Sequence, residues 1–198
     1  NNKKFILIQG PTGVGKSDTI IEIGKNLPIE IINCDVGQFY KPFSIGTAKP
    51  CLKSKTIPHH LFDIITIPKN LSVIEYRNKI VSMMNNIWER GNIPVLVGGS
   101  SFYGKSLFFP PHGKPAHWND DSNVKGSWEE LNQLDPQRAA TLEKNDTYRI
   151  ARALNMLRMT GDIPSNFIPY FNPIPGSALI LFLNRGREDL YSRINKRT

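Results

Sequence analysis

The segment that most constrains this chain is a glycine-rich loop near its start, Gly10-Pro11-Thr12-Gly13-Val14-Gly15-Lys16-Ser17. It matches the pattern G-x-x-x-x-G-K-[ST] in full, after an apolar run and before a helix-like stretch. Glycines let several backbone N–H groups converge on phosphate oxygens, and the helix N-terminus adds its positive end. The lysine adds a full charge, and the Ser17 hydroxyl can ligate Mg²⁺. The segment therefore predicts a P-loop, a phosphate-binding loop between a strand and a helix.

The rest of the chain alternates strand-like and helix-like segments. Apolar runs predict buried strands over residues 4–9, 29–34, 93–97 and 178–183. Between them, helices are predicted over 16–26 and, with Ser72 as N-cap and Gly91 as stop, up to residue 90. This alternation favours a parallel, doubly wound α/β sheet with a P-loop NTPase-like core. Ligands bind such sheets at the carboxyl ends of the strands. We therefore expect the P-loop, Asp35 and the segment 98–100 to line one crevice.

A change of character after Phe109 predicts a second domain. Residues 110–115 are a cluster of helix breakers, 127–161 are mainly helical, and four prolines lie between 164 and 175. We therefore divide the chain into a P-loop α/β core, residues 1–109 and 176–198, and a helical insertion over 110–175. Residues 38–68 are expected to be irregular.

Composition sets the class of protein. Hydrophobic residues make up 39% and charged residues 21%, which is typical of globular chains. No apolar run approaches the roughly 20 residues that span a bilayer, and no signal-peptide pattern is seen, so we expect a cytoplasmic protein. Cys34 and Cys51 are interpreted as ordinary thiols. The net charge of +8 favours a polyanionic partner, although many basic domains bind no nucleic acid. The missing initiator Met and the helix-like end predict a fragment of a longer protein.

One acidic residue follows a predicted strand. P-loop ATPases and GTPases usually carry a Walker-B Asp on a buried strand, but the strand over 93–97 ends in Gly98-Gly99. This argues against an NTP hydrolase. Asp35 directly follows the strand over 29–34, where it would face the P-loop and could act as a general base. A role as a helix or loop cap is an equally good interpretation, and the residues alone leave both open.

Several further motifs occur in a fixed order and together resemble one family. They are Asp35-x-x-Gln38-x-Tyr40, Gly46-Thr47-Ala48-Lys49-Pro50, Pro58-His59-His60-Leu61-Phe62-Asp63, Val97-Gly98-Gly99-Ser100, Asn145-Asp146 with Arg149 and Arg152, and Arg187-x-x-Leu190-Tyr191-x-Arg193-Ile194. With the P-loop, this set resembles the tRNA dimethylallyltransferase (tRNA isopentenyltransferase) family from Phe5 to Arg197. The P-loop alone is generic, whereas the ordered set is specific.

The resemblance implies a prenyl transfer and not a phosphorylation. The family moves a dimethylallyl group from dimethylallyl diphosphate to N6 of adenine 37, just 3′ of the tRNA anticodon. The P-loop would then hold the diphosphate leaving group together with Mg²⁺, which Ser17 would ligate. By the same resemblance, Asp35 takes the proton of the adenine amine, Thr12 lies near the reacting centre, and Arg187 binds the diphosphate from across the channel.

The resemblance also implies which residues contact tRNA. A loop nucleotide must be splayed out of its stack into the pocket. The matching positions are Asp35, Val36, Gly37 and Gln38, then Ser100, and in the insertion Tyr148, Arg149, Ile150, Ala151 and Arg152. The insertion over 110–175 would bind the anticodon stem-loop. The implied partners are tRNA and dimethylallyl diphosphate, with no membrane, and we expect a monomer. His59 and His60 are not expected to bind metal.

The chain departs from the family pattern at several positions, and the sequence leaves other functions open. Val36 stands where the family usually has Ser, Ser100 where it has Thr, and Gly186 where an Asp often precedes the arginine. The stretch from 110 to 124 is short for the family, and the portion beyond Arg197 is absent. A P-loop small-molecule kinase and a non-catalytic nucleic-acid-binding module remain alternatives. A third is adenylate isopentenyltransferase, which would prenylate free AMP or ATP, although such an enzyme needs no anticodon-arm clamp.

Overall fold

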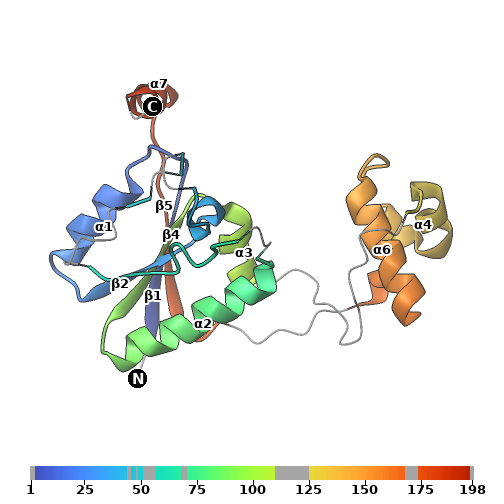
Figure 1. Ribbon diagram of the computed structural model, residues 1–198, viewed down its shortest axis with the longest axis horizontal. Coiled ribbons are helices and arrows are strands. Elements are labelled where there is room, and N and C mark those ends of the chain that lie inside the picture. The colour runs from blue at the N-terminus through green and yellow to red at the C-terminus, as the bar shows by residue number, and fades with distance from the viewer. Residues whose placement is uncertain are drawn as a thin grey trace. The chain divides into compact units, whose positions relative to one another are not determined.

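A five-stranded parallel sheet forms the centre of the larger of two compact units (Figure 1). The computed structural model describes residues 3–43, 46–47, 49–50, 57–67, 71–109, 125–167 and 174–196. The strand order is β3-β2-β4-β1-β5. The strands are β1 (Lys4–Gln9), β2 (Ile29–Asn33), β3 (His59–His60), β4 (Ile93–Gly98) and β5 (Ser177–Phe182). The predicted parallel α/β fold is confirmed, and β1, β2, β4 and β5 lie within one residue of their expected bounds.

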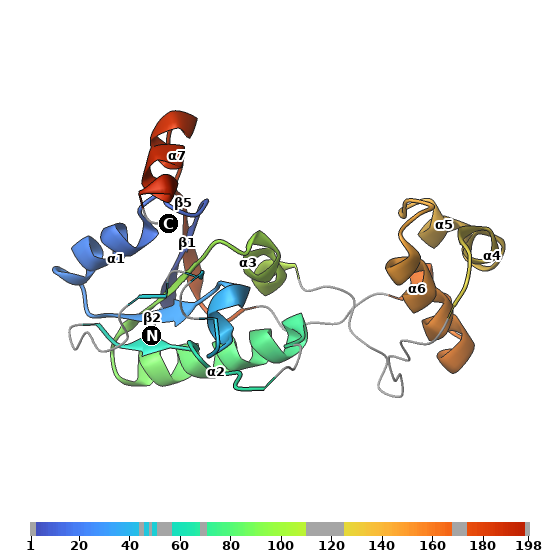
Figure 2. The same ribbon diagram turned by 45° about the horizontal axis from the view of Figure 1, so that its top comes forward.

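Alternate residues of the strands feed two separate cores. Phe5 and Leu7 of β1 point to one face, where they pack with α2 (Val73–Glu89) and α3 (Ser101–Phe108). Ile6 and Ile8 point to the other face, where they pack with Ile20 of α1 (Lys16–Gly24). Figure 2 shows α1 and α2 on opposite sides of the sheet. Because both faces are covered, the central strands are mostly apolar, as in other α/β proteins, with Glu30 and Asn33 as buried polar exceptions on β2.

The sequence of the long helix α2 contains an N-terminal cap, an apolar stripe and a C-terminal stop. Ser72 accepts a hydrogen bond from Glu75 N, and the Glu75 carboxylate accepts one from Ser72 N, which together make a capping box. Ile80, Met84 and Ile87 recur at helical spacing and are fully buried. The helix ends before Gly91, whose φ of 77° is the left-handed conformation that stops helices. Among the described residues, no helix has the length and apolarity to cross a bilayer.

The second unit spans residues 111–171 and has a small core of its own. It contains α4 (Trp128–Leu134), α5 (Pro136–Ala139), α6 (Thr147–Thr160) and the 3-10 helix η2 (Pro164–Asn166). Leu131, Ala139, Ile150 and Leu154 form the buried centre. Buried Asp135 joins the pieces, because it caps α5 through Arg138 N at 3.0 Å and accepts from Ser165 N at 2.8 Å. The stretch that was expected to be mainly helical therefore consists of several helices, and a new one starts after Asp135, where the capping carboxylate and Pro136 begin α5.

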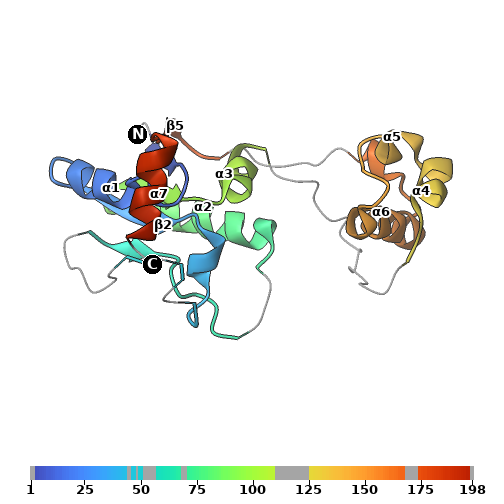
Figure 3. The ribbon, with the colours of Figure 1, turned by 90° about the horizontal axis from the view of Figure 1, so that it is seen from above.

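The segment expected to be irregular contains two short elements. The 3-10 helix η1 (Val36–Phe39) follows β2, and β3 pairs its two residues with Ile31 and Ile32. Helix α7 (Arg187–Asn195) follows β5. Figure 3 gives a view from above, in which α7 lies in front of the sheet and beside α1. Three parts of the sequence predictions lie outside the described residues: Ala48, Cys51 and the segment 110–124.

Candidate functional site

The P-loop joins β1 to α1 with its glycines in conformations that other residues rarely adopt. Gly13 has φ 76° and Gly15 has φ 107°, and Gly15 is the N-cap of α1. Lys16 Nζ folds back over the loop and donates to the carbonyls of Gly10 at 2.8 Å and Pro11 at 2.9 Å. Thr12 and Ser17 are exposed, and Val14 is buried against the core. The backbone thus has the form of a phosphate-binding nest, with the predicted polar side chains at its surface.

Two arginines from the far end of the chain contact the outside of this loop. Arg193 on α7 donates through Nε to the Gly13 carbonyl at 2.8 Å, and Arg185 donates to the Val14 carbonyl at 3.3 Å. Neither arginine was predicted from the sequence to be a site residue. The predicted Arg187 lies exposed in the first turn of α7, so its role as a diphosphate ligand stays a prediction. The motif Arg187-x-x-Leu190-Tyr191-x-Arg193 carried the only signal for Arg193, and a contact across 180 positions has no local pattern.

Asp35 sits at the carboxyl end of β2 in a tight turn that its own carboxylate stabilises. Oδ1 accepts from Gly37 N at 3.1 Å and caps η1, and Oδ2 accepts from Gly99 N at 3.4 Å. The cap interpretation is therefore correct. It does not exclude the base, because a carboxylate has about four lone-pair sites and these contacts occupy two of them.

Three neighbouring strands bring Asp35, the P-loop and the Gly98-Gly99 turn together. A Cβ placed on Gly98 would lie 1.9 Å from the Cys34 carbonyl oxygen, so only glycine lets β4 end this close to β2. A Cβ placed on Gly99 would lie 3.4 Å from Asp35 Oδ2 and 3.8 Å from the Gly10 carbonyl oxygen. The Asp35 carboxylate and the start of the P-loop therefore lie on either side of Gly99, at the carboxyl end of the sheet. The structure thus brings together the three segments that were expected from the sequence at one edge of the sheet.

Asn33, the last residue of β2, holds the turn from below and is completely buried. Its Oδ1 accepts from Asp35 N at 2.9 Å, and its Nδ2 donates to the carbonyls of Asp35 and Leu61, both at 3.1 Å. The Asn33 carbonyl in turn accepts from the buried Tyr76 hydroxyl at 2.8 Å. Sequence reasoning missed this residue, because a single Asn at a strand end is an ordinary feature.

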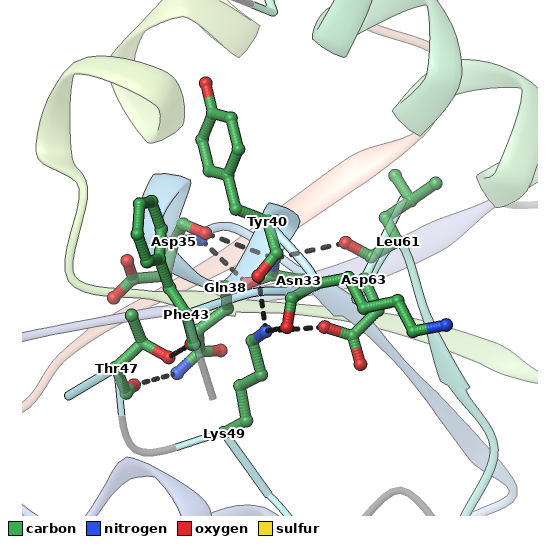
Figure 4. A network of polar contacts seen from close by, with 10 residues as sticks. Asn33, Asp35, Gln38, Tyr40, Phe43, Thr47, Lys49, Leu61 and Asp63 are labelled. Carbon is green, nitrogen blue, oxygen red and sulfur yellow. Dashed lines mark hydrogen bonds and ion pairs between the residues drawn. The ribbon is translucent and has the colours of Figure 1, made fainter. Parts of the chain in front are cut away.

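A polar network fixes the segments beside this turn (Figure 4). Gln38 Nε2 donates to the Thr47 carbonyl at 2.9 Å. Lys49, whose side chain is 7% exposed, contacts the Tyr40 carbonyl and the Asp63 carboxylate, each at 2.5 Å. Leu61 and Asp63 have φ of 61° and 54°, which is strained for residues other than glycine. Such strain persists where surrounding contacts hold it and is concentrated at functional sites.

Two further residues that were predicted to contact the base, Val36 and Ser100, contact each other beside the turn. Val36 is 37% exposed, and its N–H donates to Ser100 Oγ at 3.1 Å. The Ser100 hydroxyl therefore accepts from the turn and keeps its own O–H available as a donor. Val36, in place of the usual Ser, presents an apolar side chain beside Ser100, and its backbone N–H makes the contact with the Ser100 hydroxyl.

The predicted tRNA-contacting residues of the second unit lie along α6. Tyr148 and Arg149 are exposed, and Ala151 and Arg152 are half-buried. Arg149 pairs with Asp146 at 2.8 Å, and Arg152 contacts the Tyr148 hydroxyl at 3.5 Å. Ile150 has to be removed from the set. Its side chain is 1% exposed in the core of the unit, so packing explains it.

Other titratable groups lie away from the crevice or are buried. The His60 ring contacts buried Glu30 at 2.5 Å, and the Arg90 hydrogen bond lowers the pKa of Glu30 to about 2. Burial lowers the pKa of His59 and raises that of Cys34 to about 11, so Cys34 is an unreactive thiol. In the described part of the chain, no three His, Cys, Asp or Glu residues gather as a metal site.

Comparisons with known proteins agree with this geometry. The sequence profile described as IPP transferase matches residues 38–198. The tRNA dimethylallyltransferase of Protochlamydia amoebophila is 36% identical over all of this chain, which spans 61% of that protein. The enzyme of the same name from Geobacter sulfurreducens is 36% identical over 98% of this chain and 67% of its own length.

Two solved structures of tRNA-modifying transferases are also similar to this chain. The structure of a eukaryotic dimethylallyltransferase acting on tRNA matches with a TM-score of 0.83 at 28% identity, over 98% of this chain and 52% of that one. A tRNA isopentenylpyrophosphate transferase from Bacillus halodurans matches with a TM-score of 0.64 at 29% identity, over 100% of this chain and 65% of that one. The expected resemblance is therefore confirmed, and this chain belongs to the IPP transferase family.

Proposed function

We propose that this chain carries out tRNA dimethylallyl transfer, with dimethylallyl diphosphate as donor and N6 of adenine 37 as acceptor. One observation carries the proposal. A phosphate-binding loop and a strand-end carboxylate flank the same point at Gly99, with no second acid on the strand between them. A leaving group that is itself a diphosphate needs the first, and an amine nucleophile that must lose a proton needs the second. The names of the relatives support the same substrates.

The reaction breaks one bond and forms one bond. The C1–O bond of dimethylallyl diphosphate breaks as the bond from adenine N6 to C1 forms, and the electron pair of the broken bond leaves on the diphosphate. The N6 proton passes to the Asp35 carboxylate. An exocyclic adenine amine is a weak nucleophile, because its lone pair is delocalised into the ring. Asp35 therefore both orients the amine and accepts its proton.

The P-loop N–H groups and Lys16 stabilise the charge that develops on the diphosphate. Such stabilisation by preorganised donors is usually the largest contribution to catalysis. Thr12 is exposed on the loop and Arg187 is exposed in the first turn of α7. In this proposal Thr12 adds a polar group near the reacting centre and Arg187 adds a cation at the diphosphate.

Mg²⁺ fits the donors that the loop presents. This ion prefers oxygen ligands, keeps several waters and usually takes few protein ligands besides substrate phosphates. The exposed Ser17 hydroxyl, in the first turn of α1, is a donor of that kind. Bound there, Mg²⁺ would neutralise charge on the departing diphosphate.

The tRNA is recognised by two separate parts of the chain. Adenine 37 is splayed from the anticodon loop into the crevice, where Val36, Gly37, Gln38 and the Ser100 hydroxyl face it. The insertion, with Tyr148, Arg149 and Arg152 on α6, binds the anticodon arm through its phosphates. We infer that the protein acts in the cytoplasm as a monomer.

One incubation separates this function from its competitors. The protein is mixed with dimethylallyl diphosphate, ATP, Mg²⁺ and either tRNA, AMP or a panel of small-molecule kinase substrates, and the products are resolved by mass spectrometry. Prenylated tRNA alone is the expected product. Prenylated AMP or ATP would indicate an adenylate isopentenyltransferase, and phosphorylated small molecules without prenyl transfer would indicate a kinase. Either of these results contradicts the proposal.

A further inference from the structure

A phosphate-binding nest has two sides, and both need hydrogen-bond partners. When successive N–H groups turn inward to the anion, their carbonyl groups turn outward and lose any partner within the loop. Unsatisfied carbonyls destabilise that conformation, and the loop can relax by flipping a peptide. The loop of this chain satisfies the outward carbonyls of Gly13 and Val14 with guanidinium groups, at 2.8 Å from Arg193 and 3.3 Å from Arg185.

Helix α7 lies directly against the loop at the same place. A Cβ on Gly13 would lie 3.1 Å from Ile194 Cγ1 and 3.6 Å from Leu190 Cδ1. Gly13 has φ 76°, so the loop crosses under the helix in a conformation that needs glycine. Arg193 therefore reaches the loop from a helix that is already packed on it, and its guanidinium is placed by that packing.

Arg193 also contacts the other side of the loop. Its Nη2 lies 3.2 Å from Asp18 Oδ2, in the first turn of α1. One guanidinium thus joins a carbonyl that precedes Lys16 to a carboxylate that follows Ser17. The planar group, with five donors in a fixed fork, is suited to such a bridge, whereas an ammonium is not.

We propose that Arg193 is a positioning residue for the diphosphate site, acting through the Gly13 carbonyl to hold the P-loop N–H groups toward the anion. The proposal rests on the proposed function, because it takes the loop as the diphosphate site. Arg193 acts by geometry more than by charge, since Asp18 offsets its positive charge. Arg185 contributes in the same way at Val14, with its own guanidinium held by Asp189 at 2.6 Å.

A purely structural role, in which Arg193 only fastens α7 to the core, predicts something different. Loss of the side chain would then lower the melting temperature and leave the affinity of the folded protein for an anion unchanged. A positioning role predicts weaker anion binding at temperatures where the variant is fully folded. It also predicts a higher KM for dimethylallyl diphosphate with a kcat that changes less.

The test is titration calorimetry with inorganic pyrophosphate and Mg²⁺, well below the melting temperature of each variant. We expect Arg193→Met to bind pyrophosphate roughly 10- to 100-fold more weakly, because a hydrogen bond to a charged donor is lost at the nest. Arg193→Lys should recover part of the affinity. Lys196→Met removes the same charge from an exposed position at the C-cap of the same helix and should bind as the wild type does.

The outcomes separate this inference from the proposed function. Equal pyrophosphate affinity for Arg193→Met and Lys196→Met would overturn the positioning role. If the wild type binds pyrophosphate and Arg193→Met does not, but no prenyl transfer to tRNA occurs, the positioning role stands and the proposed function fails. If the wild type transfers prenyl groups to tRNA and Arg193→Met has an unchanged KM for dimethylallyl diphosphate, the proposed function stands and the positioning role fails.

Discussion

The side chain of Asn33 brackets the backbone of Asp35, accepting its N–H at 2.9 Å and donating to its carbonyl at 3.1 Å. A buried amide thus sets the turn from which the candidate base projects. The same Nδ2 donates to the carbonyl of Leu61, which has a positive φ. The strained segment and the base are therefore held by one side chain.

Replacement of Asn33 by Ala should slow prenyl transfer more than it weakens substrate binding. We expect kcat to fall by up to about 100-fold, since a displacement of about 1 Å at a reacting group can cost that much. The free energy of unfolding should fall by about 1–3 kcal/mol, because buried backbone groups lose their partner. Asn86→Ala, at an exposed position on α2, is the control and should change neither quantity. Normal kcat in folded Asn33→Ala would show that the bracket is not needed.

Replacement of Asp35 by Asn should abolish transfer and leave diphosphate binding intact. An amide oxygen can still accept from Gly37 N, so the turn is kept while the proton acceptor is lost. We expect kcat to fall by about 10²- to 10⁴-fold, the usual contribution of a general base. Rates come from single-turnover transfer to tRNA, and pyrophosphate affinity comes from calorimetry. A variant with wild-type turnover would remove Asp35 as the base.

Much of this arrangement could be predicted from the sequence, because it depends on local signals. The P-loop, the N-cap at Ser72 and the apolar strands each have a short pattern with a direct physical meaning. The two-residue strand β3 has none, since it depends on pairing with Ile31 and Ile32. The contacts of Arg193 with Gly13 and of Asn33 with Leu61 join distant positions, so only the fold reveals them.

The buried cluster around Glu30 predicts a pH dependence of stability. Its hydrogen bond with Arg90 lowers the pKa of Glu30 from 4.5 to about 2. A pKa that is depressed by folding stabilises the protein at pH values above 4.5, and this contribution is lost as the pH falls from about 4.5 to about 2. Glu30→Gln should therefore lower the free energy of unfolding at pH 7 by about 3 kcal/mol.

Denaturant unfolding at a series of pH values measures this effect. The difference between the wild type and Glu30→Gln should shrink steadily below pH 4.5. Glu22→Gln is the matched control, since Glu22 pairs with Lys25 at the surface and such pairs contribute little. A constant difference between the wild type and Glu30→Gln down to pH 2 would show that ionisation of Glu30 is not the source of the stability.

The most direct test of the proposed function locates the transferred group. The protein is incubated with dimethylallyl diphosphate, Mg²⁺ and a tRNA with adenosine at position 37, or the same tRNA with guanosine there, and nuclease digests are analysed by mass spectrometry. We expect one dimethylallyl group on N6 of adenosine 37 in the first tRNA and no modification in the second. Prenylation of both tRNAs, or of neither while pyrophosphate is bound, would contradict the proposal.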